Sequence, residues 1–225
     1  MINRRVSPEW SSRRAFLTCL GAISVYGAAP FSLSHSGLFT RTALASRPAV
    51  STMPRLSPEE SNPTRLFEMI TWVEAYYGIP KNLLTAMAFV ESGRTTPSQP
   101  RSPWPWTLNI GGKGRFYETK ASAQASLLDN AQDVSLIDVG LLQINTKWHA
   151  QHFRSLSDML DPSSNILYAG HYLATLAYQK GSWTKGVASY HASRPEARQR
   201  YLCVVLKEWL RRSGGRPDLL RYCQA

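Results

Sequence analysis

The feature that most constrains this chain is a short apolar segment that ends in a carboxylate. Apolar residues recur there at helical spacing and form one wide stripe: Leu83, Leu84, Met87, Ala88 and Val90. Pro80 fits the first position of such a helix, where its missing N–H group costs nothing. Gly93 and Pro97 just beyond the stripe predict the end of the helix.

Glu91 lies at the end of this predicted helix. It follows Met87 by four residues and Ala88 by three, so its side chain falls over the apolar stripe and is partly desolvated. Desolvation and the negative end of the helix dipole both raise the pKa of a carboxyl group, as a general acid at neutral pH requires. The alternative interpretation is a solvated glutamate that simply ends a helix, and the helix alone does not exclude it.

Two later motifs add hydrogen-bonding groups to this acid. The segment 140–145, Gly-Leu-Leu-Gln-Ile-Asn, begins 49 residues after Glu91 (140 − 91), and Tyr190 follows Ala188 and Ser189. Their amide and hydroxyl groups suit a sugar ligand. We therefore expect an enzyme that cleaves a glycan with a single carboxylate.

The order and separation of these pieces carry a family resemblance. The pieces are Glu91-Ser92, the segment 140–145, Asn165 in an Asn-Ile-x-x-Ala-Gly-x-Tyr-Leu pattern, and Tyr190. Together they resemble the soluble lytic transglycosylases, relatives of goose-type lysozyme. The resemblance runs from about residue 66 to 209. It implies a mainly α, lysozyme-like domain.

The resemblance also implies a role for each matching residue. In the family the glutamate of the Glu-Ser pair is the only catalytic carboxylate, which corresponds to Glu91. The Gly-Leu-x-Gln loop lines the sugar groove, which corresponds to Gly140, Leu141 and Gln143. A tyrosine hydrogen-bonds the glutamate, which corresponds to Tyr190.

Two residues depart from the family pattern, since Ser189 stands where alanine is usual and His191 where asparagine is usual. Three further polar side chains are candidates for bonds to N-acetyl and hydroxyl groups of the sugar, namely Ser92, Gln143 and Asn145. Gln143 and Asn145 have an alternative role, which is to satisfy backbone groups of their own loop.

The number of carboxylates decides the mechanism. Glu91 acting alone would protonate the glycosidic oxygen and then, as a carboxylate, activate the C6 hydroxyl of the same sugar. The resemblance implies cleavage between N-acetylmuramic acid and N-acetylglucosamine with a 1,6-anhydro product. A two-carboxylate hydrolase would need a second acid, for which Asp133 and Asp138 are the candidates.

The first 45 residues are typical of an export signal. Residues 12–17, Ser-Arg-Arg-Ala-Phe-Leu, match the twin-arginine pattern, an apolar stretch follows to Phe31, and Ala43-Leu44-Ala45 offers a cleavage site. The stretch is short for a spanning helix and is interrupted by Gly and Pro, so an uncleaved anchor is the weaker interpretation. We expect an exported protein of the periplasm or cell envelope without a stable membrane span after cleavage.

Charge and cysteine content agree with this location. The chain from Ser46 keeps 21 Lys and Arg (26 − 5) against 14 Asp and Glu (15 − 1), and this positive charge suits the anionic peptidoglycan strand. No nucleic-acid-binding motif is present, so nucleic acid is not expected as a partner. Cys203 and Cys223 would remain after cleavage, as a disulfide or as two free thiols.

No metal or cofactor is expected. His149 and His152 lie three residues apart, but no third ligand has suitable spacing, so packing or surface roles are preferred.

The remaining pattern predicts the organisation of the chain. Residues 46–60 form a flexible linker rich in Ser and Pro, residues 61–210 the transglycosylase domain, and residues 211–225 a basic tail. We expect helices to begin at Asn62-Pro63, Asp161-Pro162 and Pro195. Asn165 near the second of these starts is a candidate to cap its helix or brace the groove. Strands flanking the glycines of 111–114 predict a small β-hairpin.

Two other classes of function stay open. The first is an inactive peptidoglycan-binding module, an interpretation that the unusual His191 supports. The second is a lysozyme-like muramidase that serves a secretion or conjugation apparatus.

Overall fold

The computed structural model describes residues 47–97, 99–132, 136–191, 194–213 and 217–223. The predicted signal segment and Asp133 lie outside these residues. Among the residues described, no helix combines the length and apolarity needed to cross a membrane.

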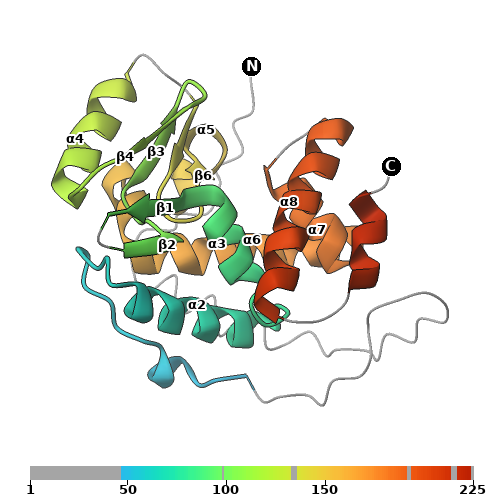
Figure 1. The fold of residues 1–225 in the computed structure, drawn as a ribbon. Helices are drawn as coiled ribbons and strands as arrows, with labels where there is room; N and C mark the ends of the chain where they lie inside the picture. The colour runs from blue at the N-terminus through green and yellow to red at the C-terminus, as the bar shows by residue number, and fades with distance from the viewer. Residues whose placement is uncertain (1–46, 98, 133–135, 192–193, 214–216, 224–225) are drawn as a thin grey trace, which may run out of the picture.

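The fold is mainly helical, as predicted, with a small sheet beside the helices (Figure 1). The helices are α2 (Pro63–Tyr77), α3 (Leu83–Ser92), α4 (Lys120–Asn130), α5 (Thr146–His149), α6 (Pro162–Lys180), α7 (Trp183–His191) and α8 (Pro195–Ser213). Short 3₁₀ segments are η2 (Val50–Thr52), η3 (Ala150–His152), η4 (Leu156–Leu160) and η5 (Pro217–Cys223). In Figure 1 the strands and α4 gather on one side of α3, and α7 and α8 lie on the other.

Three predicted helix starts are confirmed. The Asn62 side chain accepts a hydrogen bond from the Thr64 amide at 2.9 Å, and Pro63 is the first helical residue of α2. Asp161 caps α6 in the same way by accepting from the Ser164 amide at 2.9 Å. Helix α8 begins at Pro195, as expected.

The predicted start of α3 at Pro80 is wrong, because the helix begins at Leu83. The buried carboxylate of Glu74 from α2 accepts hydrogen bonds from the Asn82 amide at 2.8 Å and the Thr85 amide at 3.0 Å. Asn82 has a left-handed backbone with φ of 66°. A carboxylate from a neighbouring helix therefore satisfies the exposed N–H groups of the first turn and fixes where α3 starts.

The apolar stripe predicted for α3 understates its burial. Every residue from Leu83 to Phe89 is buried, so the helix is covered around its whole circumference. It packs against α2, α8 and the two strands that follow it, β1 (Gly93–Thr96) and β2 (Gln99–Pro103). The end of α3 is thereby held at the centre of the fold.

The predicted β-hairpin is confirmed and belongs to a larger sheet. Strands β3 (Thr107–Ile110) and β4 (Lys113–Phe116) are antiparallel, and both turn glycines, Gly111 and Gly112, have positive φ. The sequence did not predict β5 (Ile137–Val139) and β6 (Ile144–Asn145), which extend the order to β4-β3-β5-β6. A separate pair, β1 (Gly93–Thr96) and β2 (Gln99–Pro103), continues directly from α3.

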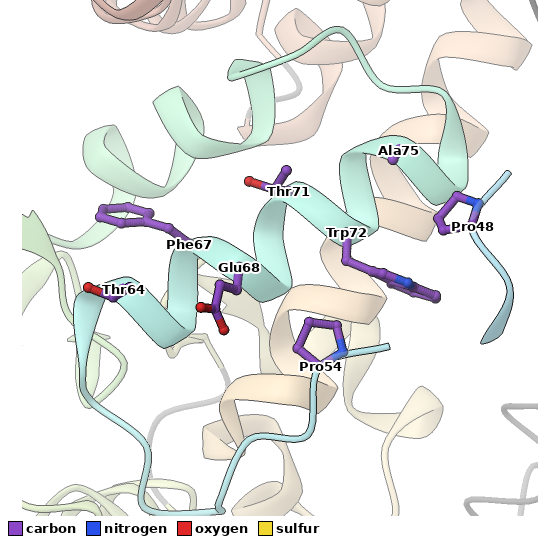
Figure 2. A pocket seen from close by; sticks show the side chains of 8 residues that line it. All are labelled: Pro48, Pro54, Thr64, Phe67, Glu68, Thr71, Trp72 and Ala75. Carbon is purple, nitrogen blue, oxygen red and sulfur yellow. The ribbon is translucent and has the colours of Figure 1, made fainter. Parts of the chain in front are cut away.

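The lead-in segment lies along α2 where it is described. Trp72 Nε1 donates a hydrogen bond to Thr52 Oγ1 at 3.1 Å, and Arg65 donates to the Arg55 carbonyl at 2.9 Å. Between this segment and α2 is an open, largely apolar groove of about 590 Å³ (Figure 2). Its lining residues are Pro48, Pro54, Thr64, Phe67, Glu68, Thr71, Trp72 and Ala75, and none of the predicted site residues is among them.

The C-terminal segment is fastened to α8. Cys203 and Cys223 form a disulfide with a Cα–Cα distance of 5.3 Å, which decides between the two states left open by the sequence. Leu219 of η5 is fully buried. Helix α8 continues through residues 211–213, and η5 packs on it.

We predict that Glu74→Ala destabilises the protein by about 2–4 kcal/mol, because it leaves buried N–H groups of α3 without an acceptor. Glu68→Ala on the same helix removes a more exposed ion pair with Arg65 and is expected to cost less than about 1 kcal/mol. Urea unfolding of the two variants measures the difference. Equal losses would show that Glu74 does not cap α3.

Candidate functional site

Glu91 is the next-to-last residue of α3, and its side chain is 6% exposed. Oε1 of its carboxyl group accepts a hydrogen bond from the Tyr201 hydroxyl of α8 at 2.6 Å. The acid therefore sits at the edge of the core, between the end of one buried helix and the side of another. The alternative of a solvated glutamate does not fit this burial.

Burial raises the pKa of Glu91 to about 8. The hydrogen bond from Tyr201 acts in the opposite direction because it favours the carboxylate, and the negative charge of Asp138 raises the pKa further. The predicted desolvation is confirmed. At neutral pH the group is mostly a protonated acid, which is the state that a proton donor needs.

The end of α3 is attached to the predicted sugar-binding loop. Ser92 Oγ donates a hydrogen bond to the Leu141 carbonyl at 2.7 Å, and Ser92 is only 1% exposed. Gly93 has no room for a Cβ atom beside the Phe89 carbonyl and the Arg101 side chain. Ser92 was expected to contact the sugar, but in the structure its hydroxyl points into the core and holds the loop next to Glu91.

The loop 140–145 is built around a buried asparagine. Asn165 Oδ1 accepts from the Leu142 amide at 2.9 Å, and its Nδ2 donates to the carbonyls of Val139 and Met159, each at 3.0 Å. Gly140 has φ of 83°, and a Cβ there would come within 2.5 Å of the Asn165 amide nitrogen. Of the two roles expected for Asn165, the structure shows the bracing one, since Asp161 caps the helix.

The two amide side chains of the loop are engaged within it. Gln143 has a left-handed backbone with φ of 46°, and its Nε2 donates to the carbonyls of Gly140 at 2.8 Å and Thr107 at 3.1 Å. Asn145 accepts from the Lys147 amide at 3.1 Å and caps α5. These contacts match the alternative in which Gln143 and Asn145 satisfy their own loop. Leu141 is fully buried, so it too supports the loop from inside.

Tyr190 does not make the hydrogen bond expected of it. Its hydroxyl donates to the Leu142 carbonyl at 3.0 Å, while Tyr201 donates to Glu91. A tyrosine hydroxyl has one proton, so the bond to Leu142 occupies the donor of Tyr190. Burial raises the pKa of the Tyr190 phenol well above its ordinary value, and Tyr190 is close enough to Glu91 for that group to raise it further.

Tyr201 is the site residue that sequence reasoning missed. It lies four residues before Val205, on the same buried face of α8. A buried tyrosine needs a partner for its hydroxyl group. That requirement was the one signal in the sequence that pointed to it.

His191, which replaces the usual asparagine, also faces the acid. Its Nδ1 lies 3.8 Å from Glu91 Oε1, and its ring stacks on Tyr201 with centroids 4.9 Å apart and planes at 13°. The side chain is 49% exposed. The imidazole therefore covers the solvent side of the Glu91–Tyr201 pair.

Asp138 on β5 is the second carboxylate near the site. Its two oxygens accept hydrogen bonds from the amides of Asn145 at 2.7 Å and Asn109 at 2.9 Å. Its charge raises the pKa of Glu91, as described above. The amide oxygen of Asn109 is buried and has no partner among the described residues.

A row of rings leads away from the acid. Tyr172 of α6 lies 5.4 Å from Tyr190 and 4.7 Å from His149, measured between ring centroids. His149 Nδ1 is 2.8 Å from the Tyr168 hydroxyl, and burial lowers the pKa of His149 to about 4, so this imidazole is neutral. In the described part of the chain, no three His, Cys, Asp or Glu side chains form a group suited to a metal ion.

We predict that Gly140→Ala destabilises the protein more than Gly112→Ala. Both positions have φ near the same value, 83° and 81°, but a Cβ at Gly112 meets nothing within 4 Å. The difference isolates the clash with Asn165, which we expect to cost at least about 2 kcal/mol more. Chemical denaturation measures it, and equal losses would contradict a tightly packed loop.

We also predict that Glu91→Gln stabilises the fold increasingly as pH rises. Below the ordinary carboxyl pKa of 4.5 the side chain is protonated in both states. As pH rises towards about 8, the unfolded chain has lost the proton that the folded protein keeps, so the free energy of unfolding falls. Gln does not ionise, so the variant does not lose this stability as pH rises. The gain in Tm over the wild type should therefore be larger at about pH 9 than at about pH 5. The exposed Glu59→Gln is the control, and a gain independent of pH would contradict a buried acid.

Comparison with known families adds one match. A family model for the transglycosylase SLT domain matches residues 68–201, more than half of the chain, and this span contains Glu91, the loop 140–145, Tyr190 and Tyr201. Comparisons with curated proteins and with solved structures found no match. Transglycosylase domains of this kind act on peptidoglycan, which lies in the cell envelope. The chain belongs to the transglycosylase SLT domain family, within the lysozyme-like superfamily.

Proposed function

We propose that this protein is a peptidoglycan lytic transglycosylase that cleaves the β-1,4 bond between N-acetylmuramic acid and N-acetylglucosamine. The observation that carries the proposal is the carboxyl group of Glu91, which is buried at the end of α3 so that its pKa rises to about 8. The match to a transglycosylase family supports it. Glu91 acts first as general acid and then as general base.

The reaction balances with this one group. Glu91 donates its proton to the glycosidic oxygen as the bond from that oxygen to C1 of N-acetylmuramic acid breaks. The resulting carboxylate accepts the proton of the C6 hydroxyl of the same sugar, and the C6 oxygen bonds to C1. The products are a 1,6-anhydro end and a free 4-hydroxyl, and Glu91 is protonated again. No other nucleophile is required.

Tyr201 serves the carboxylate stage of this cycle. Between the two proton transfers the site carries a buried negative charge, which is costly without a hydrogen-bond donor. The 2.6 Å bond from Tyr201 supplies that donor. Burial and Glu91 raise the pKa of Tyr201 well above its ordinary value, so the phenol keeps the proton that it donates.

In this proposal the sugar binds against the wall formed by the loop 140–145 and Tyr190. The contacts within and beside the loop fix the shape of that wall. The residues that make them are Ser92, Gly140, Leu141, Gln143 and Asn145. The enzyme meets the glycan strand after its own export to the periplasm or cell envelope, for which residues 1–45 are the proposed signal. The chain from Ser46, with 21 Lys and Arg (26 − 5) against 14 Asp and Glu (15 − 1), carries a net positive charge that favours an anionic polymer.

Asp138 supports a second candidate, a muramidase that hydrolyses the same bond. The two amides that bind it hold its carboxylate in place, and it is coupled electrostatically to Glu91. A fixed second carboxylate is what a hydrolase uses to activate water. The product distinguishes the two, because hydrolysis leaves a reducing end and no anhydro-sugar.

We predict that Glu91→Gln lowers the release of anhydro-sugar ends from purified sacculi by at least about 10²-fold, because Gln has no proton to donate. Pelleting with sacculi should show that the variant still binds. Turbidity measures lysis and mass analysis identifies the ends, with Glu59→Gln as the control. Asp138→Asn should keep most of the activity.

Three outcomes would contradict this scheme in different ways. Activity in Glu91→Gln would remove the single-acid mechanism. Reducing ends that disappear in Asp138→Asn would establish the muramidase. Binding without lysis by the wild-type protein would identify a peptidoglycan-binding module.

A further inference from the structure

The strongest unassigned feature near the acid is the imidazole of His191. It approaches the same oxygen of Glu91 that accepts the Tyr201 bond, at 3.8 Å through Nδ1. This separation is longer than a hydrogen bond. Bonds at catalytic groups are often long in a free enzyme and tighten when substrate binds. The ring is thus placed to donate to Glu91 after a small movement.

The position of the ring is set by stacking. His191 lies parallel to Tyr201, with planes at 13°, at the last residue of α7. Tyr201 is itself fixed by its bond to Glu91. The stack therefore leaves Nδ1 facing the carboxyl group while half of the side chain remains in solvent.

We propose that His191 is a positioning residue of the transglycosylase cycle, in which its Nδ1–H group hydrogen-bonds the Glu91 carboxylate as that charge forms. The role rests on the proposed function, since a transient carboxylate exists only if Glu91 gives up its proton. Neutral imidazole donates one hydrogen bond, and imidazolium adds a positive charge. Both forms favour the ionised state of Glu91 over the protonated one.

The other titratable groups around this pair act in known directions. Tyr201 on α8 and Tyr190 on α7 stay neutral, because burial and Glu91 raise the pKa of both phenols. Asp138 on β5 carries a like charge that opposes ionisation of Glu91. Removal of the His191 nitrogen should therefore raise the pKa of Glu91 further.

Two substitutions separate the hydrogen bond from the stack. His191→Phe keeps an aromatic ring on Tyr201 but has no nitrogen, whereas His191→Asn keeps a donor but loses the ring. His152→Phe is a matched control, because His152 also stacks on a tyrosine, Tyr168, with centroids 5.3 Å apart. The side chain of His191 is half-exposed, so its variants are expected to fold, which thermal unfolding checks.

For His191→Phe we expect kcat on purified sacculi to fall about tenfold with KM little changed, because the variant loses one hydrogen bond to a charged group. The alkaline limb of the pH–kcat profile should move to higher pH. His191→Asn should recover part of both effects. Carbon-13 NMR of the Glu91 carboxyl group, assigned with Glu91→Gln, should show the pKa rising in the order wild type, Asn variant, Phe variant.

Wild-type rates and an unmoved Glu91 pKa in His191→Phe would overturn the proposal. So would a loss confined to His191→Asn, which would mean that the ring only supports Tyr201 by packing. The NMR titration needs no turnover. The wild-type protein could fail to cleave sacculi while the Glu91 pKa still differs between the wild type and His191→Phe. That result would contradict the proposed function and leave the contact between His191 and Glu91 standing.

Discussion

A helix that is apolar on nearly every side must be enclosed by the rest of the chain, and α3 is such a helix, with Thr85 as the one polar residue between Leu83 and Val90. The sheet and α4 lie on one side of it and α7 and α8 on the other (Figure 1). Its start is fixed by Glu74 and its end by the bond from Ser92 to the Leu141 carbonyl. Any polar group at the end of this helix is held at the rim of the core, and Glu91 is that group.

Most of the residues expected to bind sugar make hydrogen bonds that build the surroundings of the acid. Ser92 bonds the loop, Asn165 braces it, and Gln143 closes it onto Gly140 and Thr107. Each bond satisfies a buried polar group that would otherwise destabilise the fold. Together these hydrogen bonds hold the loop beside Glu91, so the acid stays desolvated. The family motif thus marks the structure that holds the acid.

How far the sequence predicts this structure depends on the range of each interaction. Helix starts at Asn62-Pro63 and Asp161-Pro162 follow from neighbouring residues, and both are confirmed. The start of α3 at Leu83 depends on Glu74 from another helix, so local pattern placed it wrongly at Pro80. The β3–β4 hairpin has its turn in adjacent glycines. Strands β5 and β6 are very short. β5 pairs with β3, far away in sequence, and β6 pairs with β5, so no local pattern predicted either strand.

The same limit applies to the site. The burial of Glu91 follows from spacing on one helix, and it is confirmed. Its partner Tyr201 is 110 residues away, and only the tertiary fold shows which of several tyrosines reaches it. The family pattern favoured Tyr190, whose hydroxyl bonds the Leu142 carbonyl instead. Sequence order identifies the acid better than it identifies the groups around the acid.

The geometry also divides the work between the two oxygens of Glu91. Oε1 accepts the Tyr201 hydrogen and faces His191, and no described residue donates a hydrogen bond to Oε2. An oxygen that accepts a strong hydrogen bond is the poorer place for the acid's own proton, so that proton belongs on Oε2. In the proposed mechanism Oε2 is then the atom that protonates the glycosidic oxygen, and Tyr201 and His191 stabilise the negative charge at Oε1. The proposed mechanism, in which one carboxyl group acts as acid and then as base, therefore draws on the different partners of its two oxygens.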